Sequence, residues 1–193
     1  MSITDRRIRE RAQRHDLIIA AARDLAEAEG WEAVTTRRLA ALVEYSQPVL
    51  YSHFEGKDAI VTAVALEGYV ELAHLLHGAL QAAGSPEAEP RAVASAYLKF
   101  ARENPAVYEA MFTLSVEMRF AQTDTPAPLS ESFVEIRTAL APLAADRDVE
   151  TFTEVVWSCL HGLATLSQAG RLRPEFYDQR VSMLVDQLST APV

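Results

Sequence analysis

The stretch TTRRLAALVEYSQPVLYSHFEGK, residues 35–57, contains two short apolar patterns separated by a tight turn. Thr35 or Thr36 can cap a first helix, and Ser46 can cap a second helix over residues 47–52. Helices of about eight and seven residues are too short to be stable alone in water, so they must pack on each other and on the rest of the chain. The side chains available for this packing are Leu39, Ala40, Val43, Tyr45, Leu50 and Phe54. The pattern predicts a helix-turn-helix.

The side chains on the outer faces of these two helices suit the major groove of DNA. Amide and guanidinium groups can bond base edges, apolar groups can contact thymine methyls, and hydroxyl, imidazole and ammonium groups can hold phosphates. The outward set comprises Thr35, Thr36, Arg37, Gln47, Val49, Tyr51, His53 and Lys57. The start of the second helix, Ser46–Pro48, is the end expected to enter the groove. On these residues alone, a helical hairpin inside a larger bundle, with a solvated polar face, stays open as the alternative.

The sequence around this motif is similar to a known family. Residues 21–64, AARDLAEAEGWEAVTTRRLAALVEYSQPVLYSHFEGKDAIVTAV, resemble the DNA-binding domain of the tetracycline-repressor (TetR) family of bacterial transcriptional regulators. The similarity covers residues 14–66 and is closest in Ser46-Gln47-Pro48-Val49-Leu50-Tyr51, followed by His53-Phe54 and Lys57. A shorter stretch, Trp157-Ser158-Cys159-Leu160-His161-Gly162, resembles a tryptophan-histidine-glycine signature in the C-terminal domains of some members.

The resemblance implies a role for each matching position. It implies base contacts from Arg37, Gln47, Pro48, Val49 and Tyr51, and phosphate contacts from Thr35, Thr36, Tyr51, His53 and Lys57. The turn departs from the family pattern, because Glu44 stands where the family usually has glycine and Tyr45 where it has a small aliphatic residue. Positive φ is uncommon for glutamate, so we expect Glu44 either to adopt that conformation or to alter the turn.

The remaining sequence also predicts helix throughout. Of the 193 residues 49% are apolar and only seven are glycine, and the period-two alternation of strands is absent. We expect an all-α fold of about nine helices. A three-helix DNA-binding domain over residues 1–56 would be joined by a long helix to a helical ligand-binding and dimerisation domain over residues 57–193. The first helix is expected over residues 7–29, with an apolar stripe at Leu17, Ile18, Ala21, Leu25 and Ala28.

The chain is acidic overall but basic at its start. A formal net charge of −9 argues against a general nucleic-acid coating protein, whose affinity rests on neutralising phosphates. A small, locally positive face remains compatible with this charge, since near the start only Asp5 and Glu10 oppose Arg6, Arg7, Arg9, Arg11 and Arg14. The single cysteine, Cys159, excludes an intramolecular disulfide. The charged start and the short apolar runs predict a cytoplasmic protein with no membrane partner.

Two apolar stripes near the C-terminus predict a dimer surface. They run through Val149, Phe152, Val156, Cys159, Leu163 and Leu166, and through Tyr177, Val181, Leu184 and Leu188. Ordinary intramolecular packing is the alternative for each stripe, whereas the family resemblance implies a four-helix interface made by two helices of each subunit. One helix-turn-helix would neutralise about four phosphates, too few for tight binding by an acidic chain. A homodimer on a palindromic operator, in double-stranded DNA, doubles the contacts.

Aromatic and methionine residues in the middle of the chain are candidates for a ligand pocket. They are Tyr108, Met111, Phe112, Met118, Phe120, Phe133, Trp157 and His161. Such residues also make ordinary core, but in the TetR family the C-terminal domain commonly encloses an inducer. The sequence then indicates a repressor released from DNA by a small, largely apolar effector, which would shift the long helix that begins at Lys57.

Two other classes of function are weighed against this interpretation. The C-terminal domain of a helix-turn-helix regulator can bind a protein partner in place of a small molecule, and the sequence does not separate the two. An all-helical enzyme is a remote third, because no nucleophile, metal or phosphate motif is present. Glu71, His74 and His77 lie on one helix face, which we interpret as solvent-exposed rather than as a metal site. No metal and no cofactor are expected.

Overall fold

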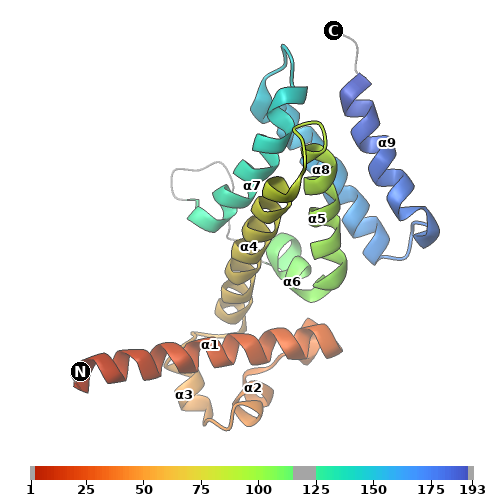
Figure 1. Ribbon diagram of the computed structural model, residues 1–193. Helices are drawn as coiled ribbons and strands as arrows, with labels where there is room; N and C mark the ends of the chain where they lie inside the picture. The colour runs from red at the N-terminus through yellow and green to blue at the C-terminus, as the bar shows by residue number, and fades with distance from the viewer. Residues whose placement is uncertain (1–2, 115–124, 191–193) are drawn as a thin grey trace. The chain divides into compact units, whose positions relative to one another are not determined.

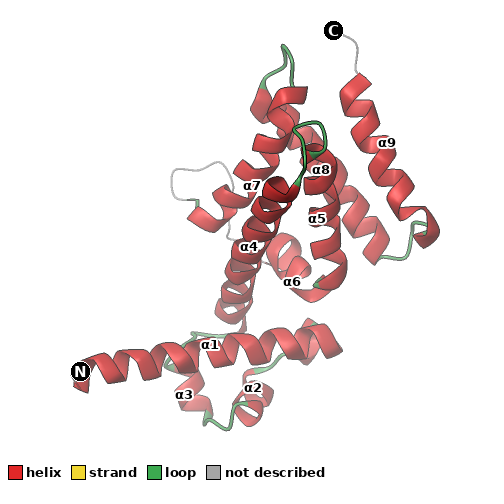
Figure 2. Cartoon of the chain, in the orientation of Figure 1, coloured by secondary structure: helices red, strands yellow, loops and turns green. Residues whose placement is uncertain are grey.

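The computed structural model describes residues 3–114 and 125–190, and every regular element within these ranges is a helix (Figures 1 and 2). The prediction of an all-α fold with about nine helices is confirmed for this part of the chain. The elements are α1 (Ile3–Glu29), η1 (Trp31–Ala33), α2 (Thr36–Leu42), α3 (Gln47–Tyr51), α4 (Lys57–Ala82), α5 (Glu89–Glu103), α6 (Pro105–Glu109), a π-helix (Ala110–Leu114), α7 (Ala127–Leu140), η3 (Ala141–Leu143), α8 (Val149–Gln168), η4 (Pro174–Phe176) and α9 (Tyr177–Thr190).

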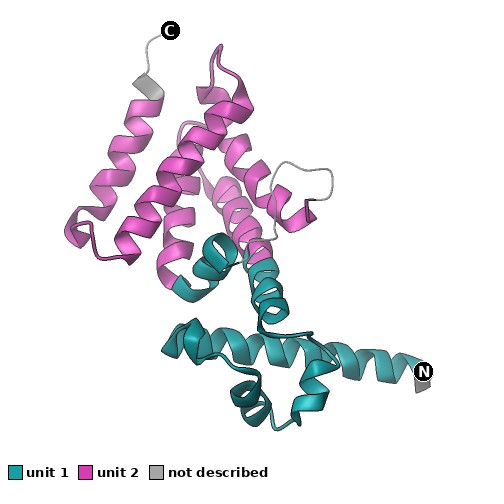
Figure 3. Ribbon diagram, turned by 180° about the vertical axis from the view of Figure 1, so that it is seen from behind, with its two compact units in different colours: residues 1–68, 104–117 teal, residues 69–103, 118–193 magenta. Residues whose placement is uncertain are grey.

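The helices form two compact units, coloured separately in Figure 3. Unit 1 contains the described residues of 1–68 and 104–117, and unit 2 contains those of 69–103 and 118–193. Helix α4 is shared, because its residues up to Gly68 belong to unit 1 and the rest belong to unit 2. The expected functional boundary after residue 56 therefore falls inside unit 1, and it stays a prediction about function.

The core of unit 1 is built on one face of α1. Its buried apolar residues are Ile18, Ile19, Ala22, Leu25 and Ala26, at the spacing of a helical core stripe. The predicted stripe was wrong at Leu17, which is 46% exposed, and at Ala28, which is exposed. Alanine and leucine cover most of this helix, so composition alone does not fix which of two overlapping stripes faces the core.

Three side chains of the first part of unit 1 fasten α6 to α1 and η1. The Glu27 carboxylate accepts the backbone N–H groups of Ala106 and Val107, each at 3.1 Å. Trp31 Nε1 donates to the Ala106 carbonyl at 2.8 Å, and an Arg23 guanidinium donates to Asn104 Oδ1 at 2.9 Å. The N-cap residue of α6, Asn104, makes no side-chain cap of its own. Glu27 therefore supplies the acceptor that the free N–H groups at this helix start require.

A glycine lets α4 approach α6 and the π-helix closely. A Cβ atom placed on Gly68 would lie 2.5 Å from Val107 Cγ1 and 2.8 Å from Met111 Sδ. Val107 and Met111 are themselves buried, so neither can move into solvent to make room. Within the residues described there, α6 is followed directly by the π-helix.

Unit 2 is a bundle in which α5 packs against α7, α8 and α9. Its core includes Tyr97 and Phe100 of α5, Ile136 of α7 and Leu160 of α8. The start of α8 is capped by the Asp148 carboxylate, which accepts from the Thr151 N–H at 2.9 Å and from the Thr151 hydroxyl at 2.7 Å. These two hydrogen bonds to the ionised carboxylate lower the pKa of Asp148.

Helix α4 is apolar along most of its length. By length and composition it contains an 18-residue window apolar enough to cross a bilayer. Isolated polar residues divide this helix into short apolar runs. The length of its uninterrupted apolar runs in the sequence therefore underestimates how apolar the helix is. Half of that window is buried inside the protein, and Ile60, Val64 and Leu76 are almost inaccessible to solvent. The apolarity of α4 fits a core helix shared by the two units.

Candidate nucleic-acid interface

Helices α2 and α3 form the predicted helix-turn-helix within unit 1. Its inner face is buried as expected at Leu39, Ala40, Val43, Leu50 and Phe54, whereas Tyr45 is only half-buried. The exposed fraction of Leu39 is 0% and that of Leu50 is 1%, so each helix is held by its apolar side. This packing explains how helices of seven and five residues persist without stability of their own.

The turn between the two helices contains the unusual backbone angle expected from the sequence. Glu44 has φ 55°, and the N–H of Tyr45 reaches back to the carbonyl of Ala40 at 2.9 Å. This bond closes a Schellman-type helix end, in which the residue with positive φ is commonly glycine. The chain therefore keeps the turn geometry and places a strained glutamate in it. Of the two outcomes that the sequence left open, positive φ at Glu44 or an altered turn, the structure shows positive φ.

Most of the predicted DNA-facing residues lie on the outer surface of α2 and α3. The exposed ones are Thr35, Arg37, Ser46, Gln47, Pro48 and Tyr51, and the half-buried ones are Thr36, Val49, His53 and Lys57. The Tyr51 ring, 52% exposed, places its hydroxyl 3.4 Å from Thr36 Oγ1 and so links the outer faces of the two helices. Polar groups from both helices are thereby gathered on one side of the motif.

The two N-cap residues of the motif, Thr35 and Ser46, differ in the hydrogen bonds of their side chains. The Thr35 hydroxyl accepts the N–H of Arg38 at 3.2 Å and caps α2, so Thr35 is the cap among the two candidates, Thr35 and Thr36. Ser46 has the extended backbone of an N-cap, but its side chain makes no cap hydrogen bond. The Ser46 hydroxyl therefore does not satisfy an N–H group of α3; Pro48 has no N–H, and the Val49 N–H donates to the Ser46 carbonyl at 3.0 Å.

The two predicted phosphate contacts nearest the core are partly engaged inside unit 1. Lys57 Nζ donates to the Trp31 carbonyl at 2.5 Å, which uses one of the three ammonium hydrogens. Nδ1 of His53 is buried without a hydrogen-bond partner, and burial lowers the pKa of this imidazole. The positive charges of Arg11, His15 and Arg14 lower the His53 pKa further.

Several residues that sequence reasoning missed position this motif. An Arg11 guanidinium on α1 donates to the Ser52 carbonyl, at the end of α3, over 2.9 Å. Arg38 on α2 forms a two-point ion pair with Glu29 of α1, with N···O distances of 2.7 and 2.8 Å. The Arg38 hydrogen bonds lower the pKa of the Glu29 carboxyl. Sequence carried no signal that separates Arg38 from its neighbour Arg37, because both are exposed on a short helix.

The predicted ligand-pocket residues are divided between the two units. Tyr108 and Met111 are buried in unit 1, and the Tyr108 and Phe112 rings lie 4.6 Å apart there. In unit 2 the Trp157 indole donates to the Tyr97 hydroxyl at 3.1 Å, and its ring meets Phe133 edge-on at 6.3 Å. His161 is half-buried, and burial lowers its pKa. Met118 and Phe120 lie outside the described residues.

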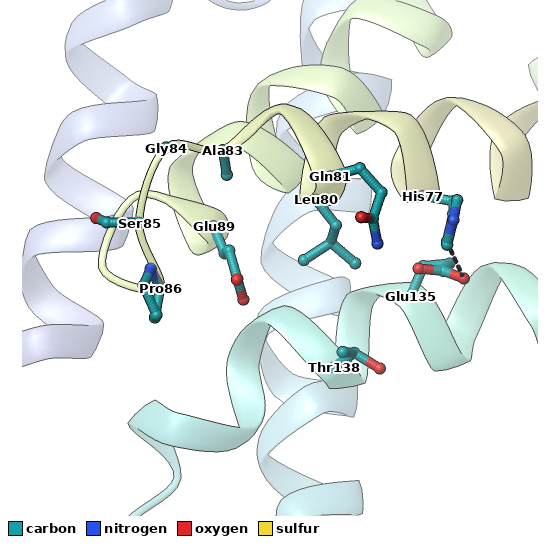
Figure 4. A pocket seen from close by; sticks show the side chains of 10 residues that line it. All are labelled: His77, Leu80, Gln81, Ala83, Gly84, Ser85, Pro86, Glu89, Glu135 and Thr138. Carbon is teal, nitrogen blue, oxygen red and sulfur yellow. Dashed lines mark hydrogen bonds and ion pairs between the residues drawn. The ribbon is translucent and has the colours of Figure 1, made fainter.

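A cavity of about 530 Å³ lies in unit 2 between the end of α4, the start of α5 and α7 (Figure 4). Its lining is mostly polar and includes Gln81, Glu89, Glu135 and Thr138. Figure 4 shows His77 beside Glu135, with 3.2 Å between His77 Nδ1 and Glu135 Oε1. Trp157 and His161 do not line this cavity. Glu71, His74 and His77 are exposed on α4.

The dimer stripes predicted on α8 and α9 are only partly on the surface. Phe152 and Val156 are buried inside unit 2, whereas Cys159 is exposed and Leu166 is 41% exposed. The residues of the predicted α8 stripe are on average less than 3.6 positions apart. The stripe therefore turns by about 100° around the helix between Val149 and Leu166. The outward stripe of α8 instead runs through Val155, Cys159, Gly162 and Leu166. On α9, Val181 is buried and Met183 is 54% exposed.

Both parts of the sequence match known protein families. Residues 18–64 match the domain described as bacterial regulatory proteins, tetR family, and residues 90–188 match the domain described as tetracyclin repressor-like, C-terminal domain. An uncharacterized HTH-type transcriptional regulator of Bacillus subtilis, YobS, is 32% identical over 94 residues. That alignment covers 49% of each protein, so the chain spans about half the length of the curated relative it matches.

Solved structures show the same fold. A protein of unknown function from Rhodococcus sp. RHA1 superposes with a TM-score of 0.76 at 23% identity, over 91% of this chain and 92% of the other. The TetR-family regulator PfmR from Thermus thermophilus gives a TM-score of 0.65 at 20% identity, over 91% and 98% of the two chains. These likenesses concern the fold alone. Together with the two matching domains, the helix-turn-helix geometry leads to one assignment: the chain belongs to the TetR family of bacterial transcriptional regulators and not to a class of enzymes.

Proposed function

We propose that this protein is a homodimeric repressor that binds a palindromic operator through α2 and α3 and is released by a small, largely apolar effector. The observation that supports DNA binding best is the outer face of α3, where Gln47 and Tyr51 are exposed while Leu50 behind them is buried. A short helix held from behind, with its polar side chains outward, is the arrangement that reads a major groove.

Each outward residue has a role in this proposal. Gln47 and Arg37 bond base edges, and Val49 and Pro48 contact thymine methyls. Tyr51 places its ring on a sugar or methyl and its hydroxyl on the DNA backbone. Phosphates are held by Thr35, Thr36, Ser46, His53 and Lys57. Phosphate contacts set affinity and orientation, whereas the base contacts set sequence preference.

Dimerisation is supported by the outward stripe of α8. Val155 is 57% exposed, and a Cβ atom on Gly162 would meet nothing within 4 Å. A mid-helix glycine that faces open space costs about 1 kcal/mol relative to alanine, which favours a reason for it outside the monomer. A second copy of α8 approaching at Gly162 supplies that reason, and exposed Met183 and half-buried Leu184 would let α9 complete a four-helix interface.

The effector response is proposed from the aromatic residues of the helical bundle. Trp157, Phe133 and His161 offer an apolar, aromatic surface in unit 2, whereas the cavity in Figure 4 has a polar lining unsuited to an apolar ligand. An effector that binds one conformation more tightly would shift the protein toward it. Because α4 belongs to both units, it is the element through which such a shift would reach α2 and α3.

Enrichment of genomic DNA fragments by the purified protein tests the proposal. We expect a near-palindromic sequence whose half-sites lie about one helical turn apart, or slightly more. The Gln47→Ala variant should then lose preference at one base pair of each half-site, at a cost of about 1–3 kcal/mol. Gln81→Ala is the matched control, since this glutamine is exposed at the end of α4 in unit 2. Failure to enrich any sequence above random fragments would overturn the proposal.

A further inference from the structure

The first half of α1 lies outside the core of unit 1. The helix begins at Ile3, but its first buried apolar residue is Ile18. The intervening segment, residues 3–14, is about 18 Å long at 1.5 Å per residue, and Figure 1 shows α1 continuing past α3 toward its N-terminus. The apolar core of unit 1 does not use this extension, so its composition reflects another use.

The basic and acidic residues of this extension lie on different faces of the helix. Arg7, Arg11 and Arg14 follow one another at intervals of four and three residues and therefore share one side of the helix. His15 lies at one border of this side, whereas the carboxylates Asp5 and Asp16 point away from it, by helical geometry. Glu10 lies at the border of the face and pairs with Arg14 at 3.7 Å and with Arg6 at 3.3 Å. The result is a helix face with basic side chains and no carboxylate at its centre. We name Arg7, Arg11 and Arg14 the arginine face.

The arginine face is directed to the end of α3. Arg11 donates to the Ser52 carbonyl at 2.9 Å, directly after the last residue of α3. The His15 ring stacks on Phe54 at 4.6 Å and lies 6.3 Å from His53. The side of α1 that carries these arginines is thus the side that holds the helix-turn-helix.

We propose that the arginine face of α1 binds the phosphate backbone of DNA next to the groove that α3 enters. This inference rests on the proposed DNA binding and adds a second contact region to it. A DNA backbone is the occupant that charge complementarity selects, because a row of guanidinium groups suits a row of phosphates. The chain carries a net charge of −9, so phosphate affinity must come from a local basic surface such as this one.

A pair of single variants tests the inference. Arg7 and Arg9 are both exposed and two residues apart, but they lie on nearly opposite sides of the helix. Arg7→Ala should weaken binding about three- to tenfold on the enriched operator duplex and on a scrambled duplex of the same length, because phosphates carry no sequence. Its salt dependence should become shallower by about 0.9 for each phosphate that the variant no longer neutralises. Arg9→Ala removes the same charge and should leave the slope close to that of the parent.

The outcomes separate this inference from the proposed function. If the parent binds no duplex, the proposed function fails. If the parent binds and Arg7→Ala keeps the parent's slope, the arginine face does not touch the DNA. Equal weakening in Arg7→Ala and Arg9→Ala would also overturn the inference, because it would indicate a long-range field in place of a direct interaction. Arg7→Lys keeps the charge and should restore most of the slope, and helical content by circular dichroism shows whether each variant is folded.

Discussion

At the scale of single residues, Glu44 holds a backbone angle that its side chain disfavours. Its φ of 55° lies in the left-handed region, which costs a residue with a Cβ about 1–2 kcal/mol. The sequence predicted this conflict because the turn of a helix-turn-helix fixes the backbone there. Sequence did not predict which resolution the chain would choose, since that depends on the hydrogen bond from Tyr45 to Ala40.

Two substitutions at Glu44 separate strain from charge. Glu44→Gly should raise the free energy of unfolding by up to about 1 kcal/mol, because the relief of strain exceeds the added freedom of the unfolded chain. Glu44→Gln keeps the strain and removes a carboxylate near the proposed DNA face, so it should strengthen DNA binding without stabilising the fold. Urea unfolding and DNA titration measure the two effects. Ala145→Gly, at another residue with positive φ, should stabilise without affecting DNA binding.

His53 makes the stability of the protein depend on pH. Its pKa in the folded protein is lowered, chiefly by burial, while in the unfolded chain it returns to about 6.5. Below that value the unfolded chain binds a proton that the folded protein resists, so the free energy of unfolding should fall as the pH falls. His53→Gln should reduce this dependence in urea unfolding, while His161, whose pKa is also lowered, retains part of it. An unchanged pH profile in His53→Gln would contradict the prediction, and the exposed His74→Gln is the control.

At the scale of elements, two glycines of α4 have opposite surroundings. A Cβ atom on Gly68 would collide with Val107 and Met111, whereas a Cβ atom on Gly78 would meet nothing within 4 Å. Both residues lie inside the same helix, so they gain the same helical propensity when replaced by alanine. Alanine substitutions at Gly68 and Gly78 therefore form a matched pair that measures how closely α4 packs against α6 and the π-helix.

Gly68→Ala should lower the free energy of unfolding by about 1–3 kcal/mol, because the buried neighbours must shift. Gly78→Ala should raise it by up to about 1 kcal/mol through helix propensity alone. Denaturant unfolding of both variants gives the comparison. A stabilised Gly68→Ala protein would mean that α4 and the π-helix are packed less closely than the distances at Gly68 indicate.

The sequence predicts helices better than it predicts which faces they bury. Caps are local, so the start of α2 could be predicted at Thr35 or Thr36, and the structure places the cap at Thr35. Faces depend on partners that are distant in sequence: α8 has apolar residues on two sides, and only packing shows that Phe152 is internal while Val155 is external. The long-range bonds of Glu27 and Arg11 escaped prediction for the same reason. The outward residues of α3 could be predicted, because a short helix with one apolar side leaves no choice of face.

At the scale of the whole molecule, the proposed dimer can be tested with two exposed valines. Val155→Glu places a charge in the outward stripe of α8, and Val134→Glu places the same charge on α7, outside that stripe. Desolvating an unpaired carboxylate at an apolar interface is costly, so Val155→Glu should sediment as a monomer. Val134→Glu should sediment as a dimer. Identical behaviour of the two variants in analytical ultracentrifugation would place the interface elsewhere.

The hydrogen bonds that join α6 to α1 have a mechanical consequence. The side chains of Arg23, Glu27 and Trp31 all form hydrogen bonds with the four-residue segment 104–107. A segment held by three side chains in this way is expected to move together with α1, which contacts α2, and α2 in turn contacts α3. A displacement of α6 is therefore expected to be transmitted through α1 to the helix-turn-helix.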